Sequence, residues 1–255
     1  MILAIIQARM GSTRLPKKVM MDLAGRPVLR HVIDRLSHAS RIDEIIVATT
    51  HDRSDDCVEE QCRDWDVPVF RGPVDDVLAR FHGAVRSIPA TRGPVEAIVR
   101  ITADCPLLDP RGVDRVVDEQ IAGQYDYVSN VDPPTWPDGL DVEVFTNAAL
   151  DEAFARATLP SEREHVTPYI RNNPRFRKSN VIHVPDLSKI RLTLDTEKDF
   201  LLIGRIYQAL YRPGGIFFLE DVLRLLEREP SLMAINAVHE RNEGYRKSLE
   251  QDPAR

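Results

Sequence analysis

A cluster of positive charge follows the first apolar segment of the chain, in the stretch Arg9-Met10-Gly11-Ser12-Thr13-Arg14-Leu15-Pro16-Lys17-Lys18. The protein as a whole has a formal net charge of −6, so the cluster needs a local explanation. Gly11 lets the backbone turn close to a ligand, and consecutive amide groups in such a turn can bind an anion. Arg14 and Lys18 would add charge-assisted hydrogen bonds to phosphate oxygens. The stretch therefore predicts a phosphate site, with a solvated basic loop as the alternative.

Two aspartates lie at the ends of other apolar segments. Asp104 lies within VRITADCPLLDP (99–110), and Asp195 ends KIRLTLD (189–195). Mg²⁺ binds one or two carboxylates together with substrate phosphates, so an aspartate at a strand end beside a phosphate site is a natural ligand. From the residues alone, a turn or a helix cap explains Asp104 at least as well, and a helix cap is the favoured explanation of Asp195.

Short apolar segments alternate with longer amphipathic ones through the first half of the chain. Strands that alternate with helices in this way form a parallel sheet covered by helices on both faces, an α/β fold. Ligands bind such sheets at the carboxyl ends of the strands, so the loops after Ala8 and Thr102 should lie at the site. The predicted strands are 3–8, 44–50, 67–70, 95–102 and 125–130, and the predicted helices are 27–39, 54–65, 75–88 and 110–123.

The second half of the chain is less regular. The segment VDPPTWPDG (131–139) has too many prolines and glycines for a helix or strand, and predicts a stiff surface loop or lid. No repeat, low-complexity segment or linker divides the chain, so residues 1–255 are expected to form a single domain. Further predicted strands are 140–145, 178–184 and 189–195, and further predicted helices are 146–157, 160–171, 196–211 and 219–229, followed by a polar tail.

The composition limits the classes of function. Hydrophobic residues make up 43% of the chain and charged residues 29%, as in ordinary soluble proteins. The negative net charge argues against nucleic acid or an anionic membrane as a partner, and no apolar run is long enough to span a membrane. The three cysteines, Cys57, Cys62 and Cys105, form no disulfide framework or zinc spacing, which favours a cytoplasmic location.

The chain resembles a known family over most of its length. Its first stretch follows the pattern A-R-x-x-S-x-R-[LI]-P-x-K, which is similar to the signature of the cytidylyltransferases that make CMP-activated acidic sugars, the CMP-Kdo and CMP-sialic acid synthetases. Within that family the chain is most similar to the SpsF-like branch of spore coat polysaccharide biosynthesis. The stretches that carry the resemblance are IIQARMGSTRLPKKVM (5–20), RGPVDDVLARF (71–81), RITADCPLLDP (100–110), GLDVEVF (139–145) and EREHVTPYI (162–170).

The resemblance implies a fold and a reaction. The fold is a Rossmann-like three-layer α/β/α arrangement around a mostly parallel sheet, the GT-A-like nucleotidyltransferase fold, with a β-rich insertion or lid. The reaction transfers CMP from CTP to a sugar or sugar-like acceptor and releases pyrophosphate, with Mg²⁺ as cofactor, in polysaccharide or glycan biosynthesis. Residues 1–130 would bind the nucleotide, residues 131–195 would bind the acceptor and pair two copies in a homodimer, and residues 196–255 would form C-terminal helices.

The resemblance also assigns residues on the nucleotide side. Arg14, Lys18 and Asp104 would be catalytic. Asp104 and Asp195 would hold the metal, which replaces the cap as the interpretation of Asp195. The nucleotide would contact Gly11, Ser12, Arg14 and Lys18 through its triphosphate, and Asp75, Asp76 and Arg80 through its base and ribose; Ala8 and Arg9 would also belong to the nucleotide site.

The acceptor side departs from the family pattern. Acid-sugar synthetases need cations for the sugar carboxylate, and Arg163 and His165 are candidates along with Arg171 and Arg191. An exposed helix start explains Arg163 and His165 equally well. Asp141 and Glu143 alternate along one predicted strand, as expected for groups that bind sugar hydroxyls. A polyhydroxylated acceptor without a carboxylate is therefore an open alternative.

Two other functions remain open at this stage. A GT-A-type glycosyltransferase would share the sheet, but its metal-binding D-x-D normally ends a strand. The D-x-D here, Asp64-Trp65-Asp66, ends a predicted helix instead. The other alternative is a non-catalytic nucleotide-binding protein on the same fold.

Overall fold

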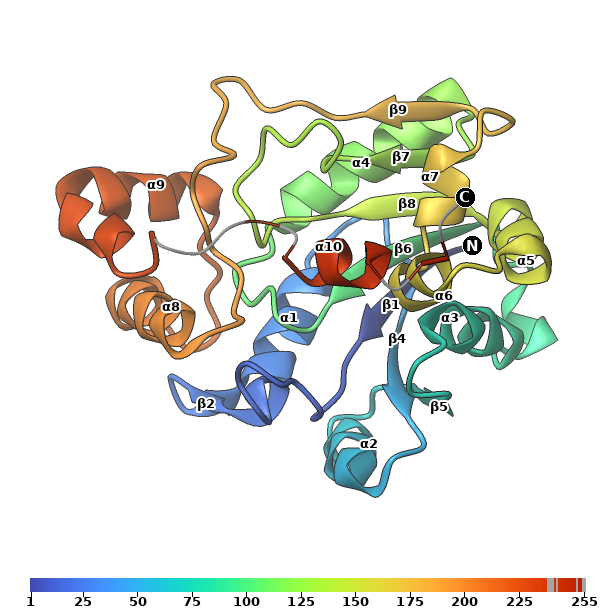
Figure 1. Cartoon of the computed structure of the whole chain (residues 1–255). Coiled ribbons are helices and arrows are strands. Elements are labelled where there is room, and N and C mark those ends of the chain that lie inside the picture. Colours follow the sequence, from blue (N-terminus) through green and yellow to red (C-terminus); the bar gives the residue numbers. More distant parts are fainter. Residues whose placement is uncertain (238–240, 242, 251, 254–255) are drawn as a thin grey trace.

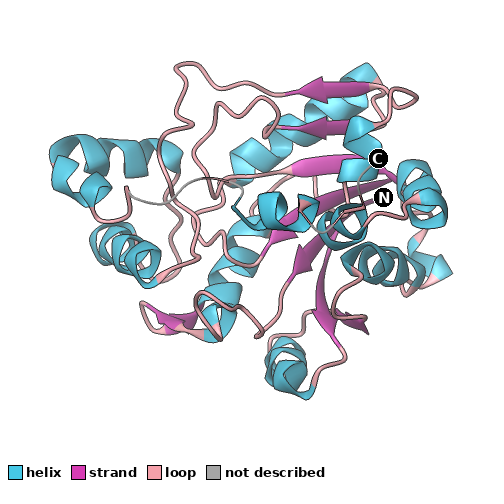
Figure 2. Ribbon diagram, viewed as in Figure 1, coloured by secondary structure: helices cyan, strands magenta, loops and turns pink. Residues whose placement is uncertain are grey.

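A mostly parallel β-sheet forms the centre of the molecule (Figures 1 and 2). The computed structural model describes residues 1–237, 241, 243–250 and 252–253. Within them, seven strands lie side by side in the order β5-β4-β1-β6-β8-β7-β9. The strands are β1 (Ile2–Gln7), β4 (Glu44–Thr50), β5 (Val69–Gly72), β6 (Ala97–Thr102), β7 (Tyr127–Ser129), β8 (Glu143–Thr146) and β9 (Lys178–Asn180), and β2 (Asp22–Leu23) and β3 (Arg26–Pro27) pair in a separate hairpin.

The order of the strands reverses beside β1. From β1 the chain moves to β4 and then to β5 on one side, and it crosses back to β6 on the other side of β1. Strands β5, β4, β1 and β6 are parallel, whereas β8 runs antiparallel to both of its neighbours, β6 and β7. The loops that leave β1 and β6 therefore open from the same edge at a topological switch point, where sheets of this kind bind ligands.

Helices cover both faces of the sheet, because alternate residues of each strand point to opposite sides. Ala4 and Ile6 of β1 pack in one apolar core with α1, α2 and α4, whereas Leu3 and Ile5 pack in a second core with α3 and α5. The helices of these layers are α1 (Val28–Leu36), α2 (Asp56–Asp64), α3 (Val77–Arg86), α4 (Pro110–Gly123), α5 (Asn147–Arg156), α6 (Pro160–His165) and α7 (Pro168–Asn172). The predicted three-layer α/β fold is confirmed.

A third apolar core lies beside the sheet, at the left of Figure 1. Helices α8 and α9 build it together with Leu140, Leu192 and Leu194. The bounds of the remaining helices are α8 (Glu197–Leu210), α9 (Leu219–Arg228) and α10 (Glu243–Leu249), with short 3₁₀ turns η1 (Lys18–Met20), η2 (Arg53–Asp55), η3 (Ala90–Arg92) and η4 (Pro230–Ala234). None of the described helices has the length and apolar character needed to cross a bilayer.

Two predictions of local structure in the second half were wrong. Residues 189–195 form no strand, since only an isolated bridge joins Arg191 to Asp138; their apolar side chains face the third core rather than a sheet. The predicted helix 160–171 is two helices, broken at Val166, which has a φ of 71°. The segment 131–139 contains no named helix or strand, as predicted, and it is held in place because Trp136 is buried and donates to the carbonyl of Val181 (2.8 Å).

Gly139 sits where the loop 131–139 meets the segment 189–195. Its φ is +100°, and a Cβ atom there would lie 2.4 Å from the nitrogen of Thr193. We expect Gly139→Ala to lower the free energy of unfolding by about 2 kcal/mol or more, because both the backbone angle and the space exclude a side chain. In the matched control, Gly204→Ala in α8, the new Cβ meets nothing within 4 Å, so stability should rise by about 0.5–1 kcal/mol. Urea denaturation measures both, and equal stability of the two variants would contradict the assignment.

Candidate active site

The basic loop after β1 is held by a buried aspartate. Asp55 is 1% exposed; one of its carboxylate oxygens accepts from the amide of Met10 (2.6 Å) and the other from the hydroxyl of Thr50. The amide of Lys17 donates to the carbonyl of Met10 (3.0 Å), which closes the loop. Sequence reasoning missed Asp55, although its place just after the second strand was a usable signal.

Lys18 lies between the two predicted metal-binding aspartates. Its Nζ donates to Oδ2 of Asp104 (2.6 Å) and to Oδ1 of Asp195 (2.7 Å), and Arg14 pairs with Asp195 (3.0 Å). The contact joins the loop after β1, the loop after β6 and the segment before α8. Asp195 is not the cap of α8, because Thr196 takes that position with a capping box to Asp199.

The bridge that Lys18 forms between Asp104 and Asp195 keeps Lys18 and Asp104 charged near neutral pH. Burial acts to lower the pKa of Lys18, but Asp104 and Asp195 outweigh it and raise that pKa above its ordinary value. Burial acts to raise the pKa of Asp104, but the ammonium of Lys18 outweighs it and lowers that pKa to about 2. Opposite charge therefore dominates desolvation at this point.

A cavity of about 510 Å³ opens above the bridge. Half of its described lining residues were predicted from the sequence, and the structure brings them together from the loop after β1, α3, the loop after β6, α6 and the segment before α8. The predicted site residues that line it are Ala8, Arg9, Gly11, Ser12, Arg14, Lys18, Arg80, Asp104, His165 and Asp195.

Three predicted site residues lie elsewhere. Asp75 is exposed and does not line the cavity. Asp76 caps α3 by accepting from the amide of Ala79 (2.8 Å), and it pairs with Arg163. Because Arg163 is bound to Asp76, it lines neither this cavity nor the neighbouring one. Arg80 does reach the cavity, yet it is 2% exposed and donates to the carbonyls of Pro73 and Val74, so it also shapes the wall.

A second cavity, of about 240 Å³, adjoins the first. Asp141, Glu143 and Arg171 line it, as the sequence predicted for an acceptor side. The residues that border both cavities are Arg14, Thr102, Asp104, His165, Asp195 and Gly244. The two cavities therefore meet at the bridge between Lys18 and the two aspartates.

Most charges in the second cavity are paired. Glu143 accepts from Arg100, from the hydroxyl of Tyr127 (2.6 Å) and from that of Thr167 (2.6 Å). Burial acts to raise the pKa of Glu143, but Arg100 outweighs it and the pKa is lowered. Glu143 thus stabilises the wall that it lines, and its contact with the acceptor stays a prediction.

The cations of the second cavity differ in what they contact. Arg191 binds Asp138 (2.8 Å) and Asp199 (2.9 Å). Arg171 forms no ion pair with a carboxylate in the described part of the chain; its guanidinium lies 5.1 Å from the centre of the Tyr245 ring. Of the two, Arg171 is therefore the one available to an anionic group.

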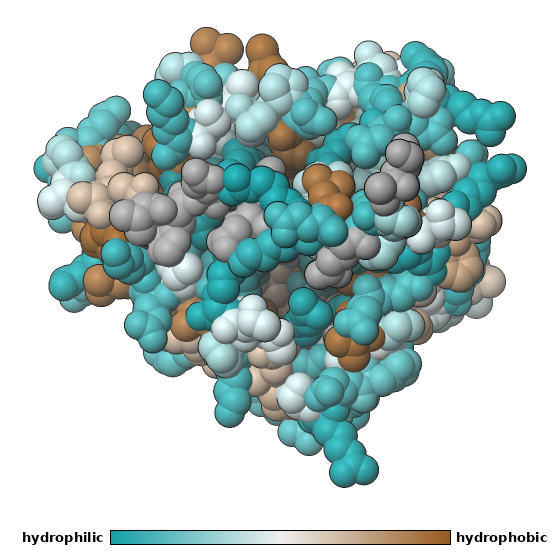
Figure 3. Space-filling view, in the orientation of Figure 1, coloured by the Kyte–Doolittle hydropathy of each residue, from teal (hydrophilic) through white to brown (hydrophobic). Residues whose placement is uncertain are grey.

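The predicted polar tail contributes to the site, which the sequence did not reveal. Helix α10 lies against α6, where Ser248 donates to Glu164 (2.6 Å) and contacts Nε2 of His165 (2.9 Å). Burial and Arg100 lower the pKa of His165 to about 4, so its ring is neutral at pH 7. Lys247 and Ser248 line the first cavity and Tyr245 the second. The face that carries α10 is mostly hydrophilic (Figure 3).

The bridge fits a divalent cation in its chemistry. Asp104 and Asp195 already share one positive charge, that of Lys18, and two carboxylates beside a phosphate site are a donor set that Mg²⁺ uses. In the described residues no three histidine, cysteine or acidic side chains converge on one point. A metal here would therefore need oxygens from a substrate as well.

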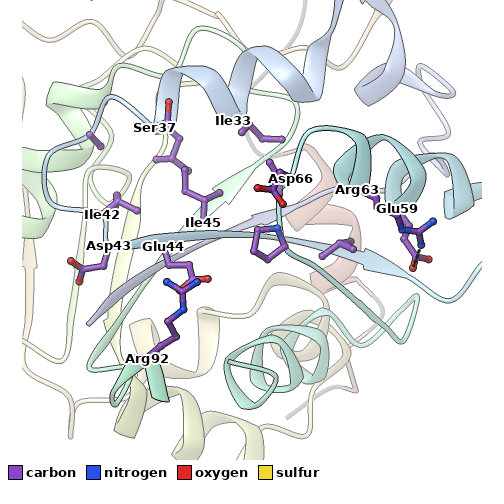
Figure 4. Close-up of a pocket in the computed structure, with 15 residues that line it drawn as sticks. Ile33, Ser37, Ile42, Asp43, Glu44, Ile45, Glu59, Arg63, Asp66 and Arg92 are labelled. Carbon is purple, nitrogen blue, oxygen red and sulfur yellow. Dashed lines mark hydrogen bonds and ion pairs between the residues drawn. The ribbon is translucent and has the colours of Figure 1, made fainter. Parts of the chain in front are cut away.

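Another cavity, of about 760 Å³, lies away from this site, and Figure 4 shows the residues that line it. It opens at the amino ends of β4 and β5, where Asp43, Glu44 and Val69 line it. Asp66, the last residue of the D-x-D sequence, also lines this cavity. The D-x-D therefore lies at the edge of the sheet opposite the basic loop, which does not support a glycosyltransferase site.

Comparison with known proteins decides the family. The model of a family described as cytidylyltransferase matches residues 3–211. The chain belongs to the cytidylyltransferase family. The resemblance predicted from the sequence is confirmed, and the protein is an enzyme, a nucleotidyltransferase.

Relatives of this cytidylyltransferase match it over almost their whole length. An uncharacterized protein of Methanocaldococcus jannaschii is 37% identical over 250 residues, 96% of this chain and 98% of that protein. The spore coat polysaccharide biosynthesis protein SpsF of Bacillus subtilis is 34% identical over 240 residues, 90% of this chain and 95% of that one. A solved cytidylyltransferase from Leptospira borgpetersenii serovar Hardjo-bovis is 31% identical, with a TM-score of 0.84 over 94% of this chain and 99% of that chain.

Removing the cation of the bridge should destabilise the protein in a pH-dependent way. We expect Lys18→Met to lower the free energy of unfolding at pH 7 by on the order of 2 kcal/mol, because two adjoining carboxylates then lose their shared counter-charge. The pKa of Asp104 is lowered in the native protein, so the stability it contributes is present above the ordinary aspartate pKa and is lost as the pH falls toward 2. The difference between wild type and variant should therefore shrink between pH 7 and pH 3.

Urea denaturation at several pH values measures this difference. Lys17→Met is the matched control, because Lys17 is adjacent in sequence but exposed. A loss of stability in the Lys18 variant that stays constant with pH would show that the charge of Lys18 does not matter.

Proposed function

We propose that this enzyme transfers CMP from CTP to a sugar or sugar-like acceptor and releases pyrophosphate. The observation that carries the proposal is the junction of two cavities at Lys18, Asp104 and Asp195. A basic cavity suits a triphosphate, and a smaller cavity beside it suits a polar acceptor. Membership of the cytidylyltransferase family supports CTP as the nucleotide, and the name of the Bacillus relative supports a role in polysaccharide biosynthesis.

The first cavity would hold the nucleotide. Arg14 and Lys18 would neutralise the phosphates, and the amides around Gly11 and Ser12 would bind their oxygens. Ala8 and Arg9 line the same wall, and Arg80 lies beneath it. Residues 1–130 thus provide most of the nucleotide site. The unpaired cysteines of the chain support a cytoplasmic location for the enzyme.

The reaction requires positioning and charge neutralisation more than covalent chemistry by the protein. An acceptor hydroxyl attacks the α-phosphorus in line with the departing pyrophosphate. Arg14 and Lys18 stabilise the negative charge that accumulates on the leaving group. Mg²⁺, bound by Asp104 and Asp195 together with substrate phosphate, would add positive charge at the α-phosphate.

The second cavity would hold the acceptor. Arg171 is the cation available to a carboxylate or another anionic group of the acceptor. Asp141 and His165 offer polar contacts to hydroxyl groups. This arrangement supports an acidic sugar over a neutral one, and it supports acceptor binding by residues 131–195.

Pyrophosphate release tests the function. The protein is incubated with each of the four nucleoside triphosphates, Mg²⁺ and a panel of acidic and neutral sugars. We expect release with CTP and an acidic sugar, and we expect Asp104→Asn to lower the rate by at least about 100-fold, because removal of one preorganised charge at the reacting centre costs that much. Asp118→Asn, on the exposed side of α4, should keep the wild-type rate.

Two outcomes would contradict the proposal. Near-normal release by the Asp104 variant would remove Asp104 from the site. Sugar transfer from a nucleotide-sugar donor, with no pyrophosphate formed from CTP, would favour a glycosyltransferase instead.

We further propose that the enzyme is a homodimer that pairs through the edge of the sheet at β9. Strand β9 is the outer strand and pairs only with β7 among the described strands. Directly after it, Ile182 and Val184 are 54% and 81% exposed. An open strand edge followed by exposed apolar side chains is a surface that a second chain can cover.

A charge on this surface should separate the two copies. We expect the wild type to elute as a dimer in size-exclusion chromatography with light scattering, and Val184→Asp with Ile182→Asp to elute as a monomer, because buried charge is costly at an apolar interface. Leu201→Asp is the control, since Leu201 is 51% exposed and belongs to α8, a helix that lies away from β9 in Figure 1. A wild type that is monomeric at all concentrations, or a double variant that stays dimeric, would contradict the proposed interface.

A further inference from the structure

Asp141 is held rigidly in the wall of the second cavity. The buried side chain of Asn130 clamps the residues on either side of it, donating to the carbonyl of Leu140 (2.8 Å) and accepting from the amide of Val142 (2.8 Å). The side chain of Asp141 is 31% exposed and lines the cavity. Its position is thus fixed by the backbone while its carboxylate stays accessible.

Only one oxygen of this carboxylate is engaged. Oδ1 accepts from Arg241, whose guanidinium also donates to the carbonyl of Trp136 (3.1 Å). No hydrogen bond reaches Oδ2 from the residues that the structure describes. One lone-pair-bearing oxygen is therefore left for a ligand in the cavity.

Each of the other carboxylates of this cavity either has both oxygens engaged or binds a cation that belongs to another part of the site. Glu143 accepts from three donors, as described above. Asp138 binds Arg191 and lies 3.8 Å from Arg241. Asp104 and Asp195 bind Lys18 and form the proposed metal site. Among these carboxylates, Asp141 alone combines an open oxygen with a place in the acceptor cavity.

The proposed reaction needs a group that takes one proton. The hydroxyl of the acceptor loses its proton as its oxygen bonds to the α-phosphorus, and a positioned base lowers that barrier. His165 borders the junction, but its ring contacts Ser248 and binds protons weakly, as its lowered pKa shows.

We propose that Asp141 is the general base of the transfer reaction, an inference that rests on the proposed function. The acceptor O–H bond breaks and its proton passes to Oδ2 of Asp141. The acceptor oxygen forms a bond to the α-phosphorus of CTP. The bond from that phosphorus to the bridging oxygen breaks, and its electron pair leaves with pyrophosphate. Asp141 then releases the proton to solvent.

The electrostatic surroundings suit this role. Burial raises the pKa of Asp141 to about 7; Arg241 and Arg100 act to lower it, and Asp138 and Glu143 act to raise it. A base whose pKa lies near the working pH both accepts and releases a proton readily. The cations on the other walls are Arg14, Arg171 and Arg191. The remaining titratable groups there are Asp104, Cys105, His165, Asp195 and Tyr245.

The pH profile of kcat tests the inference. Asp141 is active as a base only when ionised, so kcat of the wild type should rise with pH and level off above about pH 7. Asp141→Asn should lower kcat at pH 8.5 by about 10²–10⁴-fold and abolish this acid limb, with KM for CTP within about threefold of wild type. Asp141→Glu should recover part of the loss, and Asp118→Asn should match the wild type.

Arg241→Ala provides a second test that leaves the base in place. Loss of the neighbouring positive charge raises the pKa of Asp141, so the acid limb should move to higher pH while the plateau is kept. This variant also decides the matter if Asp141→Asn does not fold.

The outcomes separate this inference from the proposed function. A wild type that releases no pyrophosphate with any acceptor contradicts the proposed function itself. A wild type that is active, together with an Asp141→Asn variant that keeps kcat and the acid limb, overturns the role of Asp141 alone. An acid limb unmoved in Arg241→Ala overturns it as well.

Discussion

One ammonium group between two carboxylates organises this enzyme. Lys18 comes from the loop after β1, Asp104 from the loop after β6 and Asp195 from the segment before α8. Each carboxylate alone would be expensive to keep charged where it stands, and together they would repel each other. The ammonium group of Lys18 stabilises both carboxylates. The two cavities share this bridge, because Asp104 and Asp195 border both of them. A site prepared in this way holds a cation between two acids before any substrate arrives.

The same balance of charge extends through the second cavity. Arg100 compensates Glu143, and Arg191 compensates Asp138 and Asp199. Groups paired in this way stay in one place and shape the cavity. Two groups remain open to a ligand after these ion pairs have formed. One is the guanidinium of Arg171, which forms no ion pair with a carboxylate in the described residues, and the other is the second carboxylate oxygen of Asp141. Specificity thus follows from the atoms that these ion pairs leave open, more than from the number of charges present.

Much of the first half of the fold was predictable because its signals are local. The apolar runs around Ile5, Val47 and Val99 are buried on both faces and belong to parallel strands, and their loops carry the phosphate-binding residues. The alternating pattern at 189–195 predicted a strand that does not form, since Leu192 and Leu194 are buried against α8 and α9 without a neighbouring strand. The family resemblance suggested that Asp76 and Arg163 contact ligands. Their ion pair with each other joins distant segments of the chain, so no local sequence pattern could show it. Tyr245 and Ser248 were missed for the same reason.

The contributions of Arg241, Tyr245, Lys247 and Ser248 have a consequence for biosynthesis. The nucleotide loop, the sheet and both bridging aspartates leave the ribosome before these residues do. A nascent chain can therefore bury the two apolar cores on the faces of the sheet while the partner of Asp141 and part of both cavity walls are still untranslated. The scaffold is therefore synthesised before the last residues of the site. A chain that stops short of Arg241 would be a folded protein whose reaction centre is open to water.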